Sequence, residues 1–518
     1  MCGFAGAFRR GGGEVCSADT LVRMRDRMAH RGPDGAGLWR SPEGDCALVH
    51  RRLSIIDLSE AAAQPMANDD GSVVLAFNGE IYNHAELRRE LEAPGRVRFR
   101  TDHSDTEVLL RAYEAWGIAS LERLHGMFAF AIVDRRDRER PLLHLVRDRA
   151  GVKPLYLART SRGEWLFGSE IRALLAHPDL RPEMDRTALW HYLTFIVAPA
   201  PLTLFRGIFK IPAGHGVTID HRGEARAWCW WDCRPSRDTQ LTEDDLTEDE
   251  AVDELGRLLR RAIARRMVSD VPFGVLLSGG VDSSLNVVLM SELMERPVST
   301  FTIGYEGEES FNEFEHARRV SARYRTDHHE ARITRDQVEE FLPLLVRLQD
   351  EPIADNVCIP LYFLAESVRA GGCTVVQVGE GADENLLGYW WCDHYLKKAI
   401  DVYEPARRGA NARLARLRDR LLARHRAASQ EDREIRRRAE RGEELFWGGA
   451  VCWWGELRER LTPVPRPFRE SIECPVEGLL PDSHRELDSH GVVAHHLGAL
   501  TGALREPEVL GKIPYMEM

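Results

Sequence analysis

The chain has 518 residues, which is more than one hydrophobic core usually organises, so two or more domains are expected. Its 43% hydrophobic and 29% charged residues are typical of a soluble globular protein, and no uncharged apolar run is long enough to span a bilayer. The net charge of −12 argues against general binding to nucleic acid, and ten scattered cysteines without a secretion signal indicate reduced thiols in a cytoplasmic protein.

The chain begins Met1-Cys2-Gly3, and a second residue as small as cysteine allows the initiator methionine to be removed. Cys2 would then carry the free α-amino group. Such an amine titrates near neutrality and can accept the thiol proton, so Cys2 is a candidate nucleophile that carries its own general base. An incidental cysteine at position 2 is the alternative, and taken alone it would be preferred.

Two later stretches combine a structural signal with a chemical one. The apolar run from Val73 predicts a strand that ends in Asn78-Gly79, which is most often a hairpin turn. The Asn78 amide and the Gly79 N–H could also form an oxyanion hole. Ser104-Asp105 precedes a helical pattern from Val108 to Trp116, and beyond a capping role the Asp105 carboxylate suits the α-amino group of a bound amino acid.

Eight motifs in this order resemble the class II glutamine amidotransferase domain, and more narrowly the glutaminase half of glutamine-hydrolysing asparagine synthetases. The motifs are Cys2-Gly3, Arg31-Gly32-Pro33-Asp34, Arg52-Leu53-Ser54, the run from Asn78 to Asn83, Asp105-Thr106-Glu107, and the runs from Gly126 to Ala131, Arg147 to Tyr156 and Phe167 to Glu170. The resemblance implies an Ntn-hydrolase αββα sandwich over residues 1–215. It also implies roles for individual residues: Cys2 as the nucleophile, Asn78 and Gly79 as the oxyanion hole, and Arg52, Asn78, Glu80 and Asp105 as the glutamine contacts.

Residues 216–250 are interpreted as a linker because they contain Pro235 and acidic runs that read as solvated surface. Apolar residues at helical spacing then predict a helix from Ala251 to Met267. The nearby pair Cys229 and Cys233 lacks a second pair of ligands, so packing is favoured over a metal site.

A phosphate-binding loop is predicted at Ser278-Gly279-Gly280, between a buried strand that ends at Leu277 and a helix that starts near Asp282. The two glycines let backbone N–H groups approach an anion, and the helix N-terminus adds partial positive charge. Because Asp282 would repel phosphate, Mg²⁺ is expected between them. An ordinary strand-to-helix turn is the alternative.

Beyond this loop, strands alternate with helical patterns, which favours a parallel sheet with helices on both faces. The candidate strands are residues 275–277, 298–303 and 374–378. Ligands of such sheets lie at the carboxyl ends of the strands. There the acidic loop from Gly379 to Glu384 carries more negative charge than a phosphate site tolerates without Mg²⁺ or a cationic partner.

This second half also resembles the asparagine synthetases, whose nucleotide loop belongs to the ATP pyrophosphatase group, and the resemblance implies a doubly wound parallel α/β nucleotide-binding domain over residues 251–518. The implied ATP contacts are Leu276 and Ile303 at the adenosine, Ser278, Gly279, Gly280, Asp282, Ser283 and Ser284 at the pyrophosphate, and Val378 and Gly379 beside the nucleotide. Asp282 and Asp383 would hold Mg²⁺, and Glu380 would support acyl-adenylate chemistry. The run from Asp350 to Asp355 is expected to line the acceptor site.

Two departures from the family pattern qualify these expectations. Val378 replaces the usual serine before Gly-Glu-Gly, which weakly suggests an acceptor other than aspartate. The family fold continues past the point that Pro514-Tyr515-Met516-Glu517-Met518 matches, so the chain is expected to be a fragment or to have an incomplete synthetase site.

Together the motifs predict a glutamine-dependent amidotransferase that uses ATP and Mg²⁺ and forms asparagine from aspartate through an acyl-adenylate. One alternative acceptor is another carboxylate, on a sugar acid or a peptide-like intermediate. A second alternative is a glutaminase with a regulatory nucleotide-binding half. No nucleic-acid or membrane partner is expected, a homodimer is compatible with the sequence, and the arginine-rich stretch 407–441 is interpreted as a solvated helix face.

Overall fold

The computed structural model describes residues 1–9, 13–93, 97–232, 241, 245–353, 355–386, 388–403, 406, 429–441, 460–461 and 474–479. The chain divides into two compact units. The first contains Met1–Arg181, Lys210–Asp232 and Ser236–Glu380, and the second contains Pro182–Phe209, Cys233–Pro235 and Gly381–Met518. Within the described residues, none of the helices combines the length and the apolar character that crossing a membrane requires.

The amino-terminal part of the first unit contains two antiparallel sheets that pack against each other, with β1 and β3 contacting β5. The first sheet includes, in spatial order, β8 (Tyr156–Arg159), β9 (Trp165–Gly168), β1 (Gly3–Phe8), β3 (Cys46–Arg52) and β2 (Gly35–Arg40). The second sheet includes, in spatial order, β12 (Ala225–Cys229), β11 (His215–Ile219), β7 (Leu142–Arg147), β6 (Gly126–Asp134), β5 (Val73–Ile81) and β4 (Met66–Ala67). β1 is buried along its whole length because it is covered on both faces.

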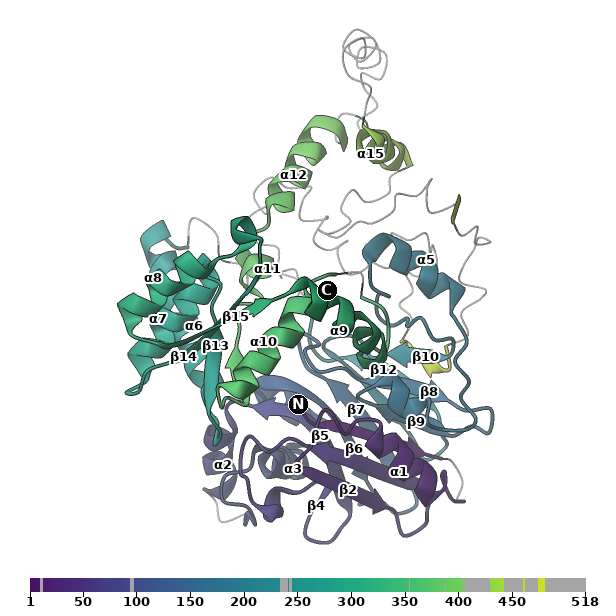
Figure 1. Cartoon of the computed structure of the whole chain (residues 1–518). Helices are drawn as coiled ribbons and strands as arrows, with labels where there is room; N and C mark the ends of the chain where they lie inside the picture. The colour runs from purple at the N-terminus through teal and green to yellow at the C-terminus, as the bar shows by residue number, and fades with distance from the viewer. Residues whose placement is uncertain are drawn as a thin grey trace. The chain divides into compact units, whose positions relative to one another are not determined.

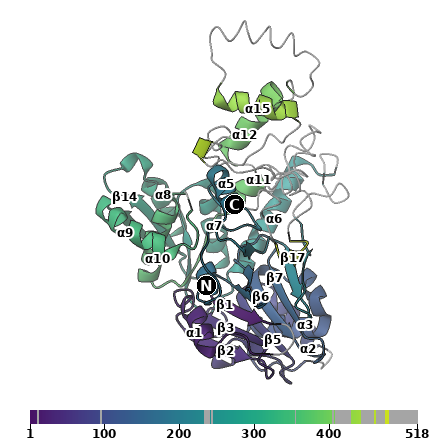
Figure 2. The ribbon, with the colours of Figure 1, turned by 90° about the vertical axis from the view of Figure 1, so that its right-hand side faces the viewer.

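Helices cover the outer faces of these two sheets (Figures 1 and 2). On the first sheet, α1 (Ala18–Asp26) contacts β1, β2 and β3, and α4 (Ile171–Leu174) contacts β9. On the second, α3 (Asp105–Trp116) contacts β4 and β5 and packs beside α2 (His84–Glu92). The layers therefore run helix, sheet, sheet, helix.

Strand β5 does not end at Asn78-Gly79 but continues to Ile81, so the hairpin alternative is wrong. Gly79 lies opposite Phe128 of β6. A Cβ at position 79 would lie 2.2 Å from the carbonyl oxygen of Met127, so glycine is needed here for close strand pairing and not for a turn.

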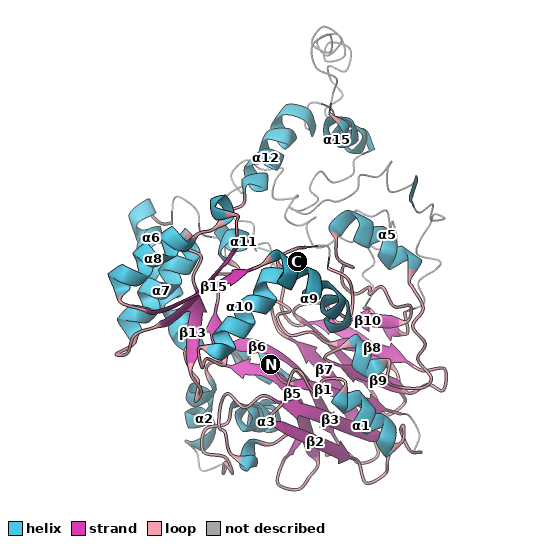
Figure 3. Ribbon diagram, in the orientation of Figure 1, coloured by secondary structure: helices cyan, strands magenta, loops and turns pink. Residues whose placement is uncertain are grey.

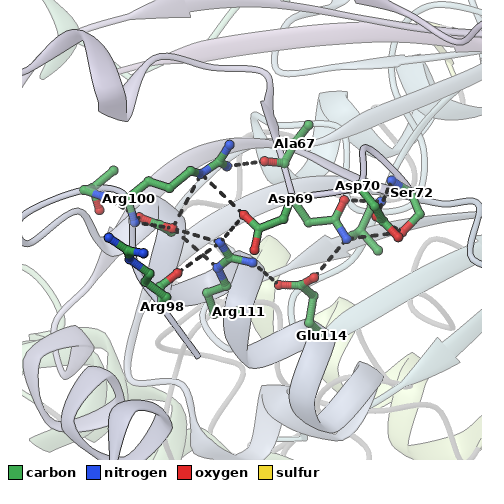
Figure 4. A network of polar contacts seen from close by, with 12 residues as sticks. Ala67, Asp69, Asp70, Ser72, Arg98, Arg100, Arg111 and Glu114 are labelled. Atoms are coloured by element: carbon green, nitrogen blue, oxygen red, sulfur yellow. Dashed lines mark hydrogen bonds and ion pairs between the residues drawn. The ribbon is translucent and has the colours of Figure 1, made fainter. Parts of the chain in front are cut away.

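A charge network around the buried residues Glu107 and Arg111 fixes the first turns of α3 (Figure 4). The carboxylate of Glu107, which is fully buried, accepts the backbone N–H of Arg100 at 3.0 Å. The guanidinium of Arg111 donates to Asp69 and to Glu114, both at 2.8 Å, and it also contacts Glu107. Because every charge in the network has a partner, the helix start and the loop before it share one anchor.

The remainder of the first unit is built around a parallel sheet with the order β15 (Asp327–Ile333), β14 (Ser299–Tyr305), β13 (Phe273–Leu276) and β16 (Val375–Gln377). Three of these strands confirm the predicted ones, whereas β15, with its run of charged and histidine residues, was not predicted. Figure 3 shows the strands between helices. On one side lie α6 (Glu248–Arg266), α7 (Val281–Leu293) and α8 (Phe314–Tyr324), and on the other lies α10 (Cys358–Ala370); α9 (Arg335–Leu348) precedes α10.

Helix α6 begins three residues earlier than the predicted helix. Thr247 accepts the backbone N–H of Glu250, and the Glu250 carboxylate accepts the N–H of Thr247, which is a capping box. Three of the acidic residues that were interpreted only as solvated surface, Glu248, Asp249 and Glu250, therefore form the first turn of α6. Their negative charge complements the helix dipole there. Strands β11 and β12 likewise lie almost wholly within the stretch predicted as a linker.

The second unit contains α5 (Arg186–Phe195), α11 (Ala382–Leu386), α12 (Trp390–Lys398), a π-helical turn (Ala399–Tyr403) and α15 (Gln430–Arg441). Its core includes Phe195, Tyr395, Tyr403 and Ile435. Arg438 is fully buried in α15 and pairs with Glu434, so for residues 429–441 the prediction of a wholly solvated face is wrong. Residues 407–428 of the same arginine-rich stretch lie outside the described residues, as do Cys233 and residues 514–518.

Candidate functional site

Cys2 lies directly before β1, and its Sγ accepts the backbone N–H of Leu53 at 3.4 Å. Burial raises the pKa of the Cys2 thiol, while the charge of Asp105 raises it further and that of Arg52 lowers it. The structure therefore brings Cys2 within electrostatic range of two predicted glutamine contacts. The structure contains Met1, so the α-amino group belongs to Met1 and not to Cys2. Burial lowers the pKa of this amine to about 6.

Arg31 fixes the backbone of the candidate nucleophile Cys2, a role that the sequence did not indicate. Its Nε donates to the carbonyl oxygen of Cys2 at 2.9 Å, and its Nη1 donates to Glu170 at 3.0 Å. Glu170 is also bonded to the imidazole of His30 at 2.8 Å. Arg31 and Glu170 lie in motifs that carry the resemblance, and His30 immediately precedes one of them, but only the fold shows that these motifs meet at Cys2.

The side-chain amide of Asn78 is buried and, within the described residues, has unused hydrogen-bonding capacity. It is 1% exposed on β5, and neither its oxygen nor its nitrogen has a hydrogen-bond partner within the described part of the chain. Leaving a buried amide unpaired costs about 1–3 kcal/mol, so such a group needs an explanation. Glu80, two residues along the same strand, faces the same side of the sheet.

Two buried carboxylates, those of Glu80 and Asp105, lie at the same end of β5 as this amide. Burial, with a second contribution from the charge of Asp105, raises the pKa of Glu80 to about 7. Burial also raises the pKa of Asp105 to about 6, although its carboxylate accepts the N–H of Ile81 at 3.1 Å. The charge of Lys153, a buried residue that the sequence did not single out, opposes the shift at Glu80. Two such carboxylates are suited to a cationic ligand group.

Arg52 offers the opposite charge. Its Nη1 donates to the carbonyl oxygen of Ser59 at 2.9 Å, and its Nη2 donates to the carbonyl oxygen of Asp57. Because carbonyl groups orient the guanidinium without neutralising it, Arg52 keeps a positive charge available for an anion. The arrangement fits an amino acid with one carboxylate and one ammonium group.

The predicted nucleotide loop joins β13 to α7 and is largely exposed to solvent. Ser278 Oγ accepts the N–H of Gly280 at 3.1 Å and lies 2.9 Å from the hydroxyl of Ser283. Gly279 has a φ of +87°, and a Cβ there would lie 2.5 Å from the Cβ of His316, so the loop requires glycine at this point. Ser284 donates its N–H to Gly280 and belongs to the first turn of α7.

The loop after β16 approaches this helix start. Val378 accepts a hydrogen bond from Asn286 of α7 at 3.0 Å through its carbonyl oxygen, and a Cβ on Gly379 would lie 3.2 Å from the Cβ of Asp282. Leu276 and Ile303 lie on β13 and β14, where both pack against the cluster around Phe301. The boundary between the compact units falls after Glu380, so the pairing of Asp282 with Asp383 stays a prediction.

Asp350 makes contacts that the sequence did not predict. Its carboxylate accepts the N–H of Ile171 and the Nε of Arg172, both at 2.6 Å. These bonds join the loop after α9 to α4 within the first unit. The expectation that residues 350–355 line the acceptor site stays a prediction, and Asp350 itself is engaged elsewhere.

One cluster has the composition of a metal site. Ligand atoms of Cys16, Glu164 and His177 lie within 4.8 Å of one another. However, Glu164 accepts the N–H of Cys16 at 2.9 Å, and the N–H of Asp179 donates to Nδ1 of His177. The proton of this imidazole is therefore on Nε2, towards Glu164, and hydrogen bonds account for the cluster.

Comparison with known proteins gives a consistent result. Residues 1–231 match the family model of the glutamine amidotransferase domain, and residues 254–490 match that of asparagine synthase. The chain is 36% identical to asparagine synthetase [glutamine-hydrolyzing] 1 of Bacillus subtilis over 75% of this chain and 59% of that protein. It is 31% identical to a putative asparagine synthetase [glutamine-hydrolyzing] of Methanocaldococcus jannaschii over 75% of this chain and 76% of that protein.

A third relative is asparagine synthetase B [glutamine-hydrolyzing] of Escherichia coli, 30% identical over 78% of this chain and 67% of that protein. The chain spans less than two thirds of the length of the Bacillus subtilis relatives, 59% of one and 64% of another.

Proposed function

Because the chain belongs to the family of glutamine-hydrolysing asparagine synthetases, we propose that it transfers the amide nitrogen of glutamine to a carboxylate in a reaction driven by ATP. The observation that carries the proposal is the buried, unpartnered amide of Asn78, since it lies at the same end of β5 as two carboxylates that are suited to an ammonium group. Asparagine is the proposed product and aspartate the proposed acceptor.

In the first reaction, removal of Met1 exposes the amine of Cys2, which takes the thiol proton. The thiolate attacks the side-chain amide carbon of glutamine, and the amide of Asn78 with the N–H of Gly79 stabilises the resulting oxyanion. Ammonia leaves as a thioester forms, and water hydrolyses the thioester to glutamate. Arg31 supports this step because it fixes the carbonyl oxygen of Cys2.

Glutamine is held through its two charged groups. Arg52 binds the α-carboxylate, and Glu80 and Asp105 bind the α-ammonium. The raised pKa values of both carboxylates support this assignment, because an incoming ammonium group would replace the missing counter-charge.

In the second reaction, the acceptor carboxylate attacks the α-phosphorus of ATP, which gives an acyl-adenylate and pyrophosphate; ammonia then displaces AMP and forms the amide. Ser278 to Ser284 would contact the pyrophosphate through the N–H of Gly279 and the serine hydroxyls, and the N–H of Gly280 would join them once it exchanges its bond to Ser278 Oγ for a phosphate oxygen. Leu276, Ile303, Val378 and Gly379 would lie against the rest of the nucleotide, and Glu380 would assist adenylate formation.

The residue types present fit Mg²⁺, since Asp282 in the first turn of α7 and Asp383 in α11 both supply carboxylate oxygens, and hard oxygen donors suit this ion. Asp282 and Asp383 would hold it, and it would offset negative charge on the phosphates when bound. We also propose the finer fold assignments. The Ntn-hydrolase αββα sandwich extends past the predicted boundary at residue 215 to include β11 and β12, and the doubly wound nucleotide-binding domain begins with α6 at Glu248, not at residue 251.

Two measurements test the proposal. Purified protein with Mg²⁺ and ATP should release pyrophosphate when aspartate is added. The same assay with a uronic acid and with a peptide carboxylate tests whether the exposed Val378 marks a preference for another acceptor. Cys2→Ala should abolish glutamine use and leave ammonia-dependent amide formation intact. Glutamate release without pyrophosphate from any acceptor would instead favour the regulatory alternative.

A further inference from the structure

Asp270 connects the nucleotide-binding part of the first unit to the glutamine site. It lies three residues before β13, the strand that leads into the nucleotide loop. Its Oδ2 accepts the N–H of Asp57 at 2.7 Å and a hydrogen bond from Nε2 of His103 at 2.6 Å. Its own N–H donates to the carbonyl oxygen of Ile55 at 2.9 Å. One carboxylate thus joins two loops that are far apart in the sequence.

The first of these loops orients Arg52. The guanidinium of Arg52 donates to the carbonyl oxygens of Asp57 and Ser59, so its direction depends on where this loop lies. Asp57 has a φ of +53°, a left-handed conformation that costs a residue with a Cβ about 1 kcal/mol or more. The bond from the Asp57 N–H to Asp270 helps to hold this unfavourable conformation.

The second loop carries His103, two residues before Asp105 at the start of α3. From inside the fold, Glu107 accepts the backbone N–H of Arg100 and that of Thr101 at 2.7 Å. From outside, Asp270 binds the imidazole of His103. The loop is therefore held at two points, and only the outer one comes from the nucleotide-binding part.

We propose that Asp270 is a positioning residue for glutamine, which holds Arg52 through Asp57 and Asp105 through His103 so that the α-carboxylate and α-ammonium contacts stay at matched positions. The inference rests on the proposed glutaminase function and names a residue of the other half as part of that site's support. Since Asp270 acts through Asp57 and His103, its effect falls on binding and not on the chemical step.

Three acidic side chains surround the imidazole of His103: those of Asp270, Asp102 and Asp57. Asp270 raises the pKa of His103, and Asp102 and Asp57 act in the same direction. Both side chains of the Asp270–His103 pair are about four-tenths exposed, so solvent weakens the ion pair, and the hydrogen bonds carry more of the effect than the charge.

The test measures glutamate release from glutamine with the full chain. Asp270→Ala should raise the KM for glutamine about fivefold to thirtyfold, the loss expected for one or two hydrogen bonds, with kcat within about twofold. Asp270→Asn keeps an oxygen acceptor and loses only the charge, so its KM should rise about twofold to fivefold. Glu292→Gln is the matched control: it removes one negative charge from α7, where Glu292 pairs with Arg260, and should leave the KM unchanged.

An NMR titration of His103 separates this inference from the proposed function. Asp270→Asn should lower the pKa of His103 whether or not the protein hydrolyses glutamine. Absence of glutamate release from the unmodified chain would overturn the proposed function. Glutamate release with an unchanged KM in Asp270→Ala, or a loss of kcat alone, would overturn the positioning role. If Asp270→Ala does not fold, an unchanged KM in both Asp270→Asn and His103→Gln would overturn it equally.

Discussion

The glutamine site and the nucleotide loop belong to one compact unit but are built in opposite ways. Asn78, Glu80 and Asp105 are buried; the amide of Asn78 has no hydrogen-bond partner within the described residues, and burial raises the pKa of both carboxylates. The nucleotide loop is exposed, and its hydroxyls bond to its own backbone and to each other. The first site therefore contains a buried polar group without a hydrogen-bond partner, which costs stability before any ligand binds. The polar groups of the second site are exposed or hydrogen-bonded to each other, so they cost the fold little.

This difference gives the two sites different relations to stability. A buried group without a partner destabilises the fold and stabilises a bound oxyanion, so removing it should trade rate against stability. An exposed loop held only by its own short bonds should lose ligand binding without affecting the rest of the unit.

Asn78→Ala should show the largest effect. The loss of one oxyanion donor typically lowers kcat about 10²–10³-fold, so glutamate release should fall by that factor while ammonia-dependent synthesis persists. Since the buried amide has no partner, the free energy of unfolding should stay the same or rise by up to about 1 kcal/mol. Steady-state kinetics and chemical denaturation measure the two quantities.

Asn83 provides the matched control for this prediction. It is also a buried asparagine, but its side chain donates to the carbonyl oxygen of Arg123 and accepts the N–H of His125, both at 2.9 Å. Asn83→Ala should therefore cost about 1–3 kcal/mol of stability and leave kcat nearly unchanged. The contrast breaks down if Asn78→Ala proves as destabilising as Asn83→Ala.

Gly279→Ala tests the other region. A Cβ at this position would meet the Cβ of His316 at 2.5 Å, and the φ of +87° is unfavourable for alanine, so the loop must move. We expect ATP-dependent pyrophosphate release to fall about a hundredfold, while glutamate release and the melting temperature change little. Gly307→Ala is the control, because Gly307 has a φ of +79° and no atom within 4 Å of its added Cβ. A loss of glutamate release in Gly279→Ala would show that the two regions are not separable.

The sequence indicated the candidate ligand-contacting residues of both sites better than the residues that position them. Parallel strands and the turn between strand and helix at Ser278-Gly279-Gly280 have local signals, and the structure confirms the parallel pairing and the order strand, turn, helix. Arg31, Lys153, Glu170 and Asp270 carry no local signal, because their roles arise from contacts across the fold. Asn78-Gly79 was ambiguous since a hairpin turn and a strand interior share this dipeptide, and only the pairing of β5 with β6 decides between them. The start of α6 was misplaced because acidic residues read equally as surface or as a helix cap.

The smallest expected effect is a pH dependence confined to the glutamine site. With pKa values of about 7 for Glu80 and about 6 for Asp105, both carboxylates are largely protonated at pH 5 and ionised at pH 8. The ammonium of glutamine binds the ionised forms, so its KM should fall about tenfold as the pH rises through this range. The same sign applied to folding means that the unliganded protein loses stability over this interval, because a raised pKa favours the protonated native state. Glu80→Gln should flatten both profiles while raising the KM at pH 8. A KM that rises between pH 5 and pH 8, or one that Glu80→Gln leaves equally steep, would show that these carboxylates do not receive the ammonium group.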